Sequence, residues 1–399
     1  MRDSILKDLT FWLLAVFAAT YIIGNIATGS LTTWDEAVYA NVSTEILRTG
    51  DWLIMHHEGR LWFDKPPLYI WCTALWYIML GISEFAVRIT SVLFGVATVL
   101  LTYIFVKKTF NKNTAIFSSL LLLALPHYLH FSKMGMLDVT LTFFISLMVY
   151  LFWMGQDDPR CLLFSGLTFF LAYLTKGFAA IAGPAIIFAY CVSSKNLRLL
   201  LKKEFLTGLI VSLFLISLWH IIQYVAGGQE AIRSYFGFHL FKRATTTLDG
   251  HTGGINFYQK VIFNKNKPWG VLIYASIAYL VWLIIKDKDR RAVLLLSWAV
   301  VVYTICAIVK TKLHWYIMPI SPALAIASGI FLERIFKNRA FRAALAVILL
   351  GMLIQVPVSW AFKLDFNAKA KDAALHSIKL PYEDDGTIFY NTVAKIRNK

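Results

Sequence analysis

Residues 85–106 read FAVRITSVLFGVATVLLTYIFV and are followed at once by Lys107 and Lys108. An α-helix needs about 20 mostly apolar residues to cross a hydrocarbon core about 30 Å thick. This run meets that length and carries one charged residue, Arg88, close to its start. The stretch therefore predicts a helix that spans a membrane and ends at a pair of lysines on one side.

Runs of this kind recur along the 399 residues, and the composition agrees with them. The residue types AVILMFWYC make up 58% of the chain and DEKR only 16%, whereas soluble domains have about 45–50% and about 25%. A membrane β-barrel would show short alternating segments instead. We therefore predict an all-α, polytopic transmembrane helical bundle of about 11 spans and exclude a soluble enzyme or a disordered chain. The predicted spans are 11–28, 85–106, 114–131, 136–154, 161–175, 177–192, 205–225, 269–285, 292–309, 313–332 and 343–360.

Positive charge gathers in the short links between these spans. The formal net charge is +16, which in a soluble protein would suggest a nucleic-acid partner. Short cytoplasmic links of membrane proteins carry an excess of Lys and Arg, so we expect no nucleic acid and place these links inside. The N-terminus is then inside, and any chemistry lies on the extracytoplasmic face. The most basic short links are residues 107–112, 195–203, 286–291 and 334–342.

The longer segments define the expected domain organisation. Residues 1–360 are predicted to form one transmembrane domain with outer loops 29–84 and 226–268, followed by a short extracytoplasmic tail, 361–399. The apolar stretch 67–80 is too short to span comfortably and is predicted to be interfacial or re-entrant. The four cysteines are scattered without a CxxC pattern, which argues against a disulfide framework or a zinc site.

The first outer loop carries two adjacent acids, Asp35 and Glu36. Residues 35–48 are predicted to form an amphipathic helix at the membrane surface that ends at Gly50. One interpretation of the acids is a capping box, Thr33-x-x-Glu36. The other is a catalytic base, because partial desolvation raises the pKa of a carboxylate and suits it to take a proton from a hydroxyl. The two roles could also be divided, with Glu36 capping and Asp35 acting as the base.

Two further charged residues lie at the outer ends of predicted spans. Asp138 starts the span 136–154 and is either a functional acid at membrane depth or an N-cap. Lys65 follows Asp64 and precedes two prolines, which hold the backbone extended and could direct its ammonium at the headgroup level. The alternative for Lys65 is a side chain that merely reaches toward lipid headgroups.

More cations lie in the second outer loop and after it. Lys310, Lys312, His314 and Tyr316 form the pattern Lys-x-Lys-x-His-x-Tyr before a span. Each basic residue could be a lipid anchor, but together they would suit a phosphate-bearing lipid. The loop 226–268, which contains Arg243, is long enough to be functional, for example as a lid.

Histidine pairs offer a weaker signal for a metal. His56 is adjacent to His57, and His127 lies three residues before His130. Metal sites need more ligands at motif spacing than either pair supplies. Isolated surface histidines are therefore the preferred interpretation, and metal dependence stays unknown.

Several of these residues together resemble a known family. The chain is similar to polyprenyl-phosphate-sugar-dependent glycosyltransferases of the C-type membrane fold, in particular the protein O-mannosyltransferase and aminoarabinose–lipid A transferase group. The resemblance covers roughly residues 30–325. The stretches that carry it are Asp35-Glu36-Ala-Val-Tyr39, Gly50-Asp51-Trp52, Phe63-Asp64-Lys65-Pro66-Pro67, Leu137-Asp138, Leu174-Thr175-Lys176-Gly177, Phe257-Tyr258, Pro268-Trp269 and Lys312-Leu-His-Trp-Tyr316.

This resemblance implies roles for particular side chains. Asp35 would be the catalytic base of an Asp-Glu pair with Glu36, and Asp138 a second acid facing the cavity. Asp64 would assist acceptor or metal binding. The resemblance implies no certain cofactor and leaves room for a divalent metal. The residues expected to bind the donor phosphate are Lys65, Arg243, Lys312 and Tyr316.

The resemblance also implies an activity and its partners. We expect inverting transfer of a sugar from a polyprenyl-phosphate donor to an extracytoplasmic hydroxyl or phosphate on a lipid, glycan or protein. The protein would lie in the cell (inner) membrane with its active site on the extracytoplasmic face. Val38 stands where many relatives have Arg, so one expected cation is missing, and Asp64 replaces the commoner Glu. Only residues 361–399 follow the last predicted span, without the large soluble C-terminal domain of several relatives, which leaves the acceptor open.

Two other classes of protein remain as alternatives. A secondary transporter or lipid-linked sugar flippase would need buried charges near the bilayer midplane and paired broken helices. The predicted spans are nearly free of central charges, and the acids gather in one outer loop, which favours an enzyme. An enzyme of the same fold that moves a non-sugar group, or a noncatalytic assembly partner, is the second alternative.

Overall fold

The computed structural model describes residues 7–24, 26, 31, 34–248 and 251–336, together with residues 343, 347, 348, 351 and 352. The predicted tail 361–399 lies outside the described residues, as does most of the predicted span 343–360. The described helices are α2 (Leu9–Ile23), α3 (Trp34–Thr49), α4 (Leu68–Leu80), α5 (Glu84–Thr109), α6 (Lys112–Ala124), α7 (Pro126–Ser132), α8 (Leu137–Met154), α9 (Pro159–Lys176), α10 (Ala182–Ser193), α11 (Lys203–Ile232), α12 (Arg243–Thr245), α13 (Phe257–Asn264), α14 (Gly270–Asp287), α15 (Arg290–Ile308) and α16 (Ser321–Ile335).

Short elements connect these helices. A two-residue hairpin, β1 (His56–His57) with β2 (Arg60–Leu61), is the strand structure of the described residues. Shorter helical turns are η1 (Gly177–Ile181), η2 (Leu197–Leu199) and η4 (His314–Ile320), and η3 (Arg233–Lys242) is π-helical. The predicted all-α fold class is confirmed.

The number of membrane spans differs in detail from the prediction. Within the described residues, seven helical stretches are long and apolar enough to cross a membrane, or eight if α6 and α7 count as one span. The predicted span 114–131 is bent by 68° between α6 and α7, because Pro126 has no N–H to continue the helix. Between α9 and α10 the chain breaks at Gly177, whose φ of 55° favours glycine. The total of about 11 spans stays a prediction.

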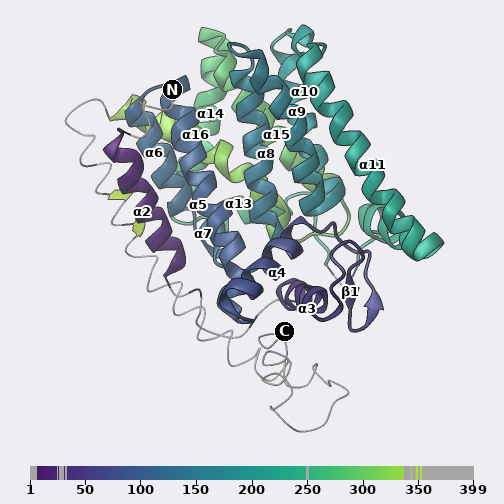
Figure 1. The fold of residues 1–399 in the computed structure, drawn as a ribbon. Helices are drawn as coiled ribbons and strands as arrows, with labels where there is room; N and C mark the ends of the chain where they lie inside the picture. Colours follow the sequence, from purple (N-terminus) through teal and green to yellow (C-terminus); the bar gives the residue numbers. More distant parts are fainter. Residues whose placement is uncertain are drawn as a thin grey trace.

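One end of the bundle gathers the interfacial elements. Figure 1 shows α3, α4 and the β1 hairpin together at one end of the long helices. Val42 and Ile46 of α3 are buried, and Gly50 ends the helix with φ 75°, as predicted. The 13-residue α4 matches the stretch predicted to be too short to span.

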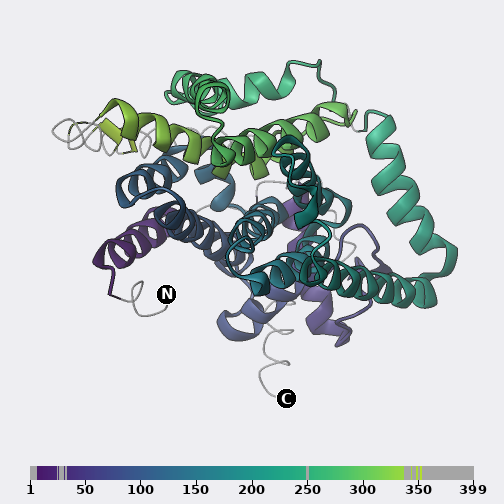
Figure 2. The same ribbon diagram turned by 90° about the horizontal axis from the view of Figure 1, so that it is seen from above.

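The predicted outer loop 226–268 is largely helical. The α11 helix continues past residue 225, breaks at Gly228 (φ 57°) and leads directly into η3 and α12. Figure 2 shows the long teal helix α11 running along one side of the molecule. One glycine turns the chain while its helical hydrogen bonding resumes, so 226–245 is helical within the predicted outer loop.

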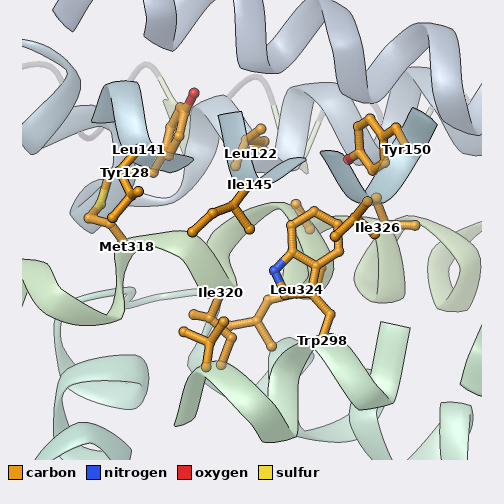
Figure 3. Packing of buried hydrophobic residues seen from close by; sticks show 14 of the residues in the cluster. Leu122, Tyr128, Leu141, Ile145, Tyr150, Trp298, Met318, Ile320, Leu324 and Ile326 are labelled. Atoms are coloured by element: carbon orange, nitrogen blue, oxygen red, sulfur yellow. The ribbon is translucent and has the colours of Figure 1, made fainter. Parts of the chain in front are cut away.

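The core of the bundle lies between α8, α15 and the chain at η4 and α16. Trp298 of α15 packs edge-on against Tyr150 of α8, with Ile145 and Leu324 nearby (Figure 3). The Trp298 indole N–H donates to the Pro319 carbonyl at 2.8 Å. Such a bond matters here because hydrocarbon offers no water to a polar group. This packing holds the end of η4, the turn that also carries Tyr316.

Candidate active site

A cavity of about 630 Å³ opens among α8, α9, α11, η3, α15 and η4. Much of its wall is apolar, with Phe169, Leu213 and Ile305 among its residues. Charged and polar side chains also line it, and five of them are residues predicted from the sequence. The charged residues and the tyrosine at η4 are Asp64, Lys65, Asp138, Lys176, Arg243 and Tyr316. The cavity can therefore hold a molecule with an anionic part and an apolar part.

Asp138 is held by a lysine across the cavity wall. Its Oδ1 accepts from the Lys176 ammonium at 2.5 Å, and both side chains are buried. Met136 occupies the N-cap of α8, and no side chain caps that helix. The N-cap interpretation of Asp138 was therefore wrong, and this acid belongs to an ion pair in the cavity.

Lys176 is a site residue that the sequence analysis did not assign to the phosphate. It is the last residue of α9, directly before Gly177. Its ammonium lies 4.8 Å from the centre of the Tyr316 ring. A Cβ on Gly177 would overlap the Tyr235 hydroxyl, so the glycine permits close approach of η3. The signal was present in Leu174-Thr175-Lys176-Gly177, where a lysine ends a predicted span.

Arg243 reaches the cavity from the helical continuation of α11. Its Nη1 donates to the Tyr316 hydroxyl at 3.0 Å. Its Nε is buried and has no hydrogen-bond partner among the described residues. Backbone bonds from Lys310 to Ala244 and from Thr311 to Arg243 join this segment to the chain before η4. Arg243 and Tyr316, each predicted to contact the donor phosphate, are hydrogen-bonded to each other here. A guanidinium with an unused donor suits a phosphate oxygen.

Lys65 lies where several charges meet. The pKa of its ammonium is lowered to about 8, mainly by burial and also by the nearby Arg243 and Lys176, while Asp35 and Asp64 oppose the shift. Asp64 accepts a hydrogen bond from the Ser234 hydroxyl at 3.3 Å. Lys65 is therefore an ammonium that loses its charge more easily than an ordinary lysine.

Asp35 lies beside this charged region without lining the cavity. It is partly exposed in the first turn of α3. Burial raises the pKa of Tyr39, and the charges of Asp35 and Asp138 raise it further. The same Asp35 charge acts on Lys65. Asp35 and Lys65 are thus close enough for their charges to interact.

Glu36 has a different environment from its neighbour. It is fully buried, and its Oε1 accepts from the Arg88 guanidinium and from the Gly135 backbone N–H, each at 2.7 Å. A Cβ on Gly135 would lie 2.6 Å from Val87 and 3.0 Å from Glu36. Its carboxylate joins α3 to α5 and to the turn before α8, outside the cavity lining, and its catalytic role stays a prediction. Thr33, the other half of the predicted capping box, lies outside the described residues.

Lys312 is also misplaced for its predicted role. Its ammonium donates to the carbonyls of Cys306 and Ala307, at 2.9 and 2.6 Å, and is buried. A cation at the C-terminus of a helix satisfies carbonyls that have no partner in the helix. Lys312 therefore caps α15 and does not line the cavity, and its binding of the donor phosphate stays a prediction.

The predicted metal ligands do not come together in the part of the chain that the structure describes. There, no group of three or more His, Cys, Asp or Glu side chains could hold a metal ion. His127 bonds instead to the carbonyl of His314 at 3.0 Å. Asp64 remains the residue predicted to assist the acceptor or a metal, and no step proposed below passes through a metal.

Known proteins resemble this chain in sequence. A model of the dolichyl-phosphate-mannose-protein mannosyltransferase family matches residues 64–221. An uncharacterised protein of Aquifex aeolicus is 29% identical over 96% of this chain and 88% of its own length. An undecaprenyl phosphate-alpha-4-amino-4-deoxy-L-arabinose arabinosyl transferase of Pseudomonas fluorescens is 28% identical over 86% of this chain. This chain spans only about 60% of that transferase's length.

Solved structures agree with the sequence relatives. ArnT from Cupriavidus metallidurans, bound to undecaprenyl phosphate, superposes with a TM-score of 0.76 at 23% identity, covering 88% of this chain and 64% of ArnT. The fold is that of the C-type membrane glycosyltransferases. An oligosaccharyltransferase of Archaeoglobus fulgidus matches with a TM-score of 0.58 at 13% identity, over 92% of this chain and 56% of that enzyme. The predicted resemblance to polyprenyl-phosphate-dependent C-type glycosyltransferases is confirmed, and the chain is a multi-pass membrane protein.

Proposed function

We propose that this glycosyltransferase relative transfers a sugar from a polyprenyl phosphate to an acceptor hydroxyl or phosphate. The observation that supports this most directly is the cavity itself, where Lys65, Lys176 and Arg243 line a space that is otherwise largely apolar. A polyprenyl-phosphate sugar has the matching parts, an anionic phosphate and an apolar tail. Two of the related proteins carry undecaprenyl phosphate in their names or as a bound molecule.

The reaction can be written with these residues. Asp35 takes the proton of an acceptor hydroxyl, and the acceptor oxygen forms a bond to C1 of the sugar. The C1–O bond to the phosphate breaks on the opposite face, which inverts the anomeric centre and leaves the phosphate with one more negative charge. Lys65 and Arg243 stabilise that charge in a site that excludes most water, where fixed charges act strongly.

The remaining cavity residues hold this arrangement. Lys176 bonds to Asp138 and faces the Tyr316 ring, and Tyr316 accepts from Arg243. The four side chains therefore connect α8, α9, α12 and η4 around the phosphate position. A phosphate that took the place of one hydrogen-bond partner in this network would leave Lys176 and Arg243 close to their present positions.

The proposed location is the inner membrane with the site on the extracytoplasmic face. In support, α3, α4 and the hairpin lie at one end of the bundle (Figure 1), and the cavity residues Asp64 and Lys65 belong to the same segment. The basic links that the positive-inside rule places in the cytoplasm begin at the other ends of the spans, for example after α5.

The experiment is sugar transfer by the purified protein in detergent. The donors are undecaprenyl phosphates that carry glucose, mannose or 4-amino-4-deoxy-L-arabinose, and the acceptors are extracted envelope lipids and glycans. We expect release of undecaprenyl phosphate together with a glycosylated acceptor. Detergent removes the two compartments that transport requires, so a flippase would give no product there. Movement of labelled donor across reconstituted vesicles without any product would overturn the proposal.

A further inference from the structure

One polar pair in the cavity has no part in the reaction described above. The Tyr173 hydroxyl of α9 and Nε2 of His220 on α11 lie 2.7 Å apart. The sequence places His220 inside the predicted span 205–225, and both residues line the cavity. Ionisable residues within membrane-spanning segments are costly and usually mark a functional path or site.

The pair lies within one helical turn of the proposed phosphate site. Tyr173 precedes Lys176 by three residues on α9, which corresponds to about 4.5 Å along the helix and to the same face. Both side chains line the same cavity. A group attached to a phosphate near Lys176 would therefore reach the Tyr173–His220 pair.

Aromatic rings surround the imidazole. The ring centres of Trp219, Tyr235 and Phe236 lie 4.7, 4.8 and 5.0 Å from that of His220. His220 bonds to Tyr173 through Nε2, and its Nδ1 has no hydrogen-bond partner in the part of the chain that the structure describes. His220, Tyr235 and Phe236 also line a smaller, adjoining cavity of about 190 Å³.

The donor has three parts, an isoprenoid tail, a phosphate and a sugar, and the Tyr173–His220 pair suits one of them. An isoprenoid tail has no hydrogen-bonding group, and the phosphate already has three cations near it. A ring nitrogen without a partner, among aromatic faces, fits a group with both hydroxyls and apolar C–H faces. The sugar is the part of the donor that has both.

We propose that His220, oriented by Tyr173, binds a hydroxyl of the sugar carried by the donor and contributes to sugar specificity. This inference rests on the proposed function. The hydrogen bond between Tyr173 and His220 fixes the plane of the imidazole, and the neighbouring aromatic rings pack around it.

The test is binding of two kinds of lipid to the purified protein in detergent, with no acceptor present. One probe is undecaprenyl phosphate without sugar, and the others carry glucose, mannose or 4-amino-4-deoxy-L-arabinose. In the wild type we expect at least one carried sugar to add affinity over the bare lipid. In His220→Phe we expect that added affinity to fall by about three- to tenfold, as for one neutral hydrogen bond. Affinity for the bare lipid should stay within twofold.

Two further variants separate recognition from structure. His220→Asn keeps an amide near the position of Nδ1 and should restore part of the lost affinity. Tyr128→Phe removes a buried hydroxyl that bonds to the Gly95 carbonyl at 2.7 Å in the core, and should leave the sugar contribution unchanged. Thermal unfolding of each variant reports whether the fold is kept.

Three results would overturn the inference. Equal weakening of bare and sugar-carrying lipid in His220→Phe would show that the pair contacts the tail or only joins α9 to α11, and would overturn the inference. Equal affinity of the wild type for all four lipids would do the same. If the wild type binds none of them, the proposed function fails first, and the inference fails with it.

Discussion

Two buried acid–base pairs, Glu36–Arg88 and Asp138–Lys176, occupy different surroundings. The first is sealed between α3, α5 and the turn before α8, where Glu36 also accepts from the Gly135 backbone. The second lines a cavity whose other wall carries Arg243 and Tyr316. Breaking a buried pair leaves an uncompensated charge wherever it lies. Of these two pairs, the second adjoins space for a substrate. Loss of the first should therefore lower mainly stability, and loss of the second mainly activity.

The largest expected effect on activity is at Asp35, the residue before Glu36. We expect Asp35→Asn to lower sugar transfer by about 10³-fold or more, because a positioned general base contributes about 10²–10⁴ in rate. Thermal stability and donor binding should be close to the wild type, since Asp35 is partly exposed. Turnover and thermal unfolding of the same detergent preparation check this, and near-normal turnover would defeat the assignment of the base.

Glu36→Gln should show the opposite pattern. It leaves the Arg88 guanidinium buried without its counter-charge, which typically costs about 3–5 kcal/mol of stability. We expect a lower unfolding temperature and yield, whereas turnover per folded molecule changes little. A variant that folds as well as the wild type but has lost transfer would return Glu36 to the catalytic pair.

The cavity pair should affect the chemistry more than the fold. We expect Asp138→Asn to lower kcat/KM by about 10²-fold, because it disturbs the cation network that faces the phosphate. Asn retains the shape and a hydrogen bond to Lys176, so unfolding should shift less than in Glu36→Gln. The comparison between the two sites would be lost if both variants were destabilised alike and kept full activity.

Lys65 should give the proposed site a characteristic pH dependence. Its pKa of about 8 means that the ammonium is present below that pH and is lost as the pH rises through it. We expect kcat/KM for the donor to fall by roughly tenfold between pH 7 and 9, since kcat/KM reports groups of the free enzyme. Lys65→Arg keeps its charge over this range and should remove the alkaline fall. An unchanged profile in Lys65→Arg would mean that another group titrates.

The smallest effect is expected at Lys312. Its ammonium caps α15 through the carbonyls of Cys306 and Ala307. Lys312→Met should therefore leave the donor KM within about twofold and lower stability by about 1 kcal/mol, the scale of one hydrogen bond or helix-end interaction. A large rise in the donor KM would restore the phosphate role that the sequence suggested.

The sequence identified the residues of the site better than it identified their contacts. Lys65, Asp138 and Tyr316 were marked by position, next to prolines or at the end of a predicted span, and Arg243 only by its place in the long loop 226–268. The structure places all four around one cavity. Glu36 and Lys312 carried the same signals. Arg88, the partner of Glu36, lies 52 residues away in the sequence, too far for a local pattern to reveal the pairing. The carbonyls that Lys312 caps lie only five and six residues before it, and the tertiary structure decides that its ammonium turns to them.

Apolar run length and the distribution of charge determined that this chain is a helical membrane protein, because hydrocarbon leaves the backbone few other ways to satisfy its hydrogen bonds. The same runs placed the candidate acids and cations near span ends. Which acid faces the cavity and which is sealed was decided by the tertiary structure, since two consecutive residues of one helix point in different directions and meet different neighbours. The helical path that brings Arg243 to Tyr316 likewise depends on a single break at Gly228.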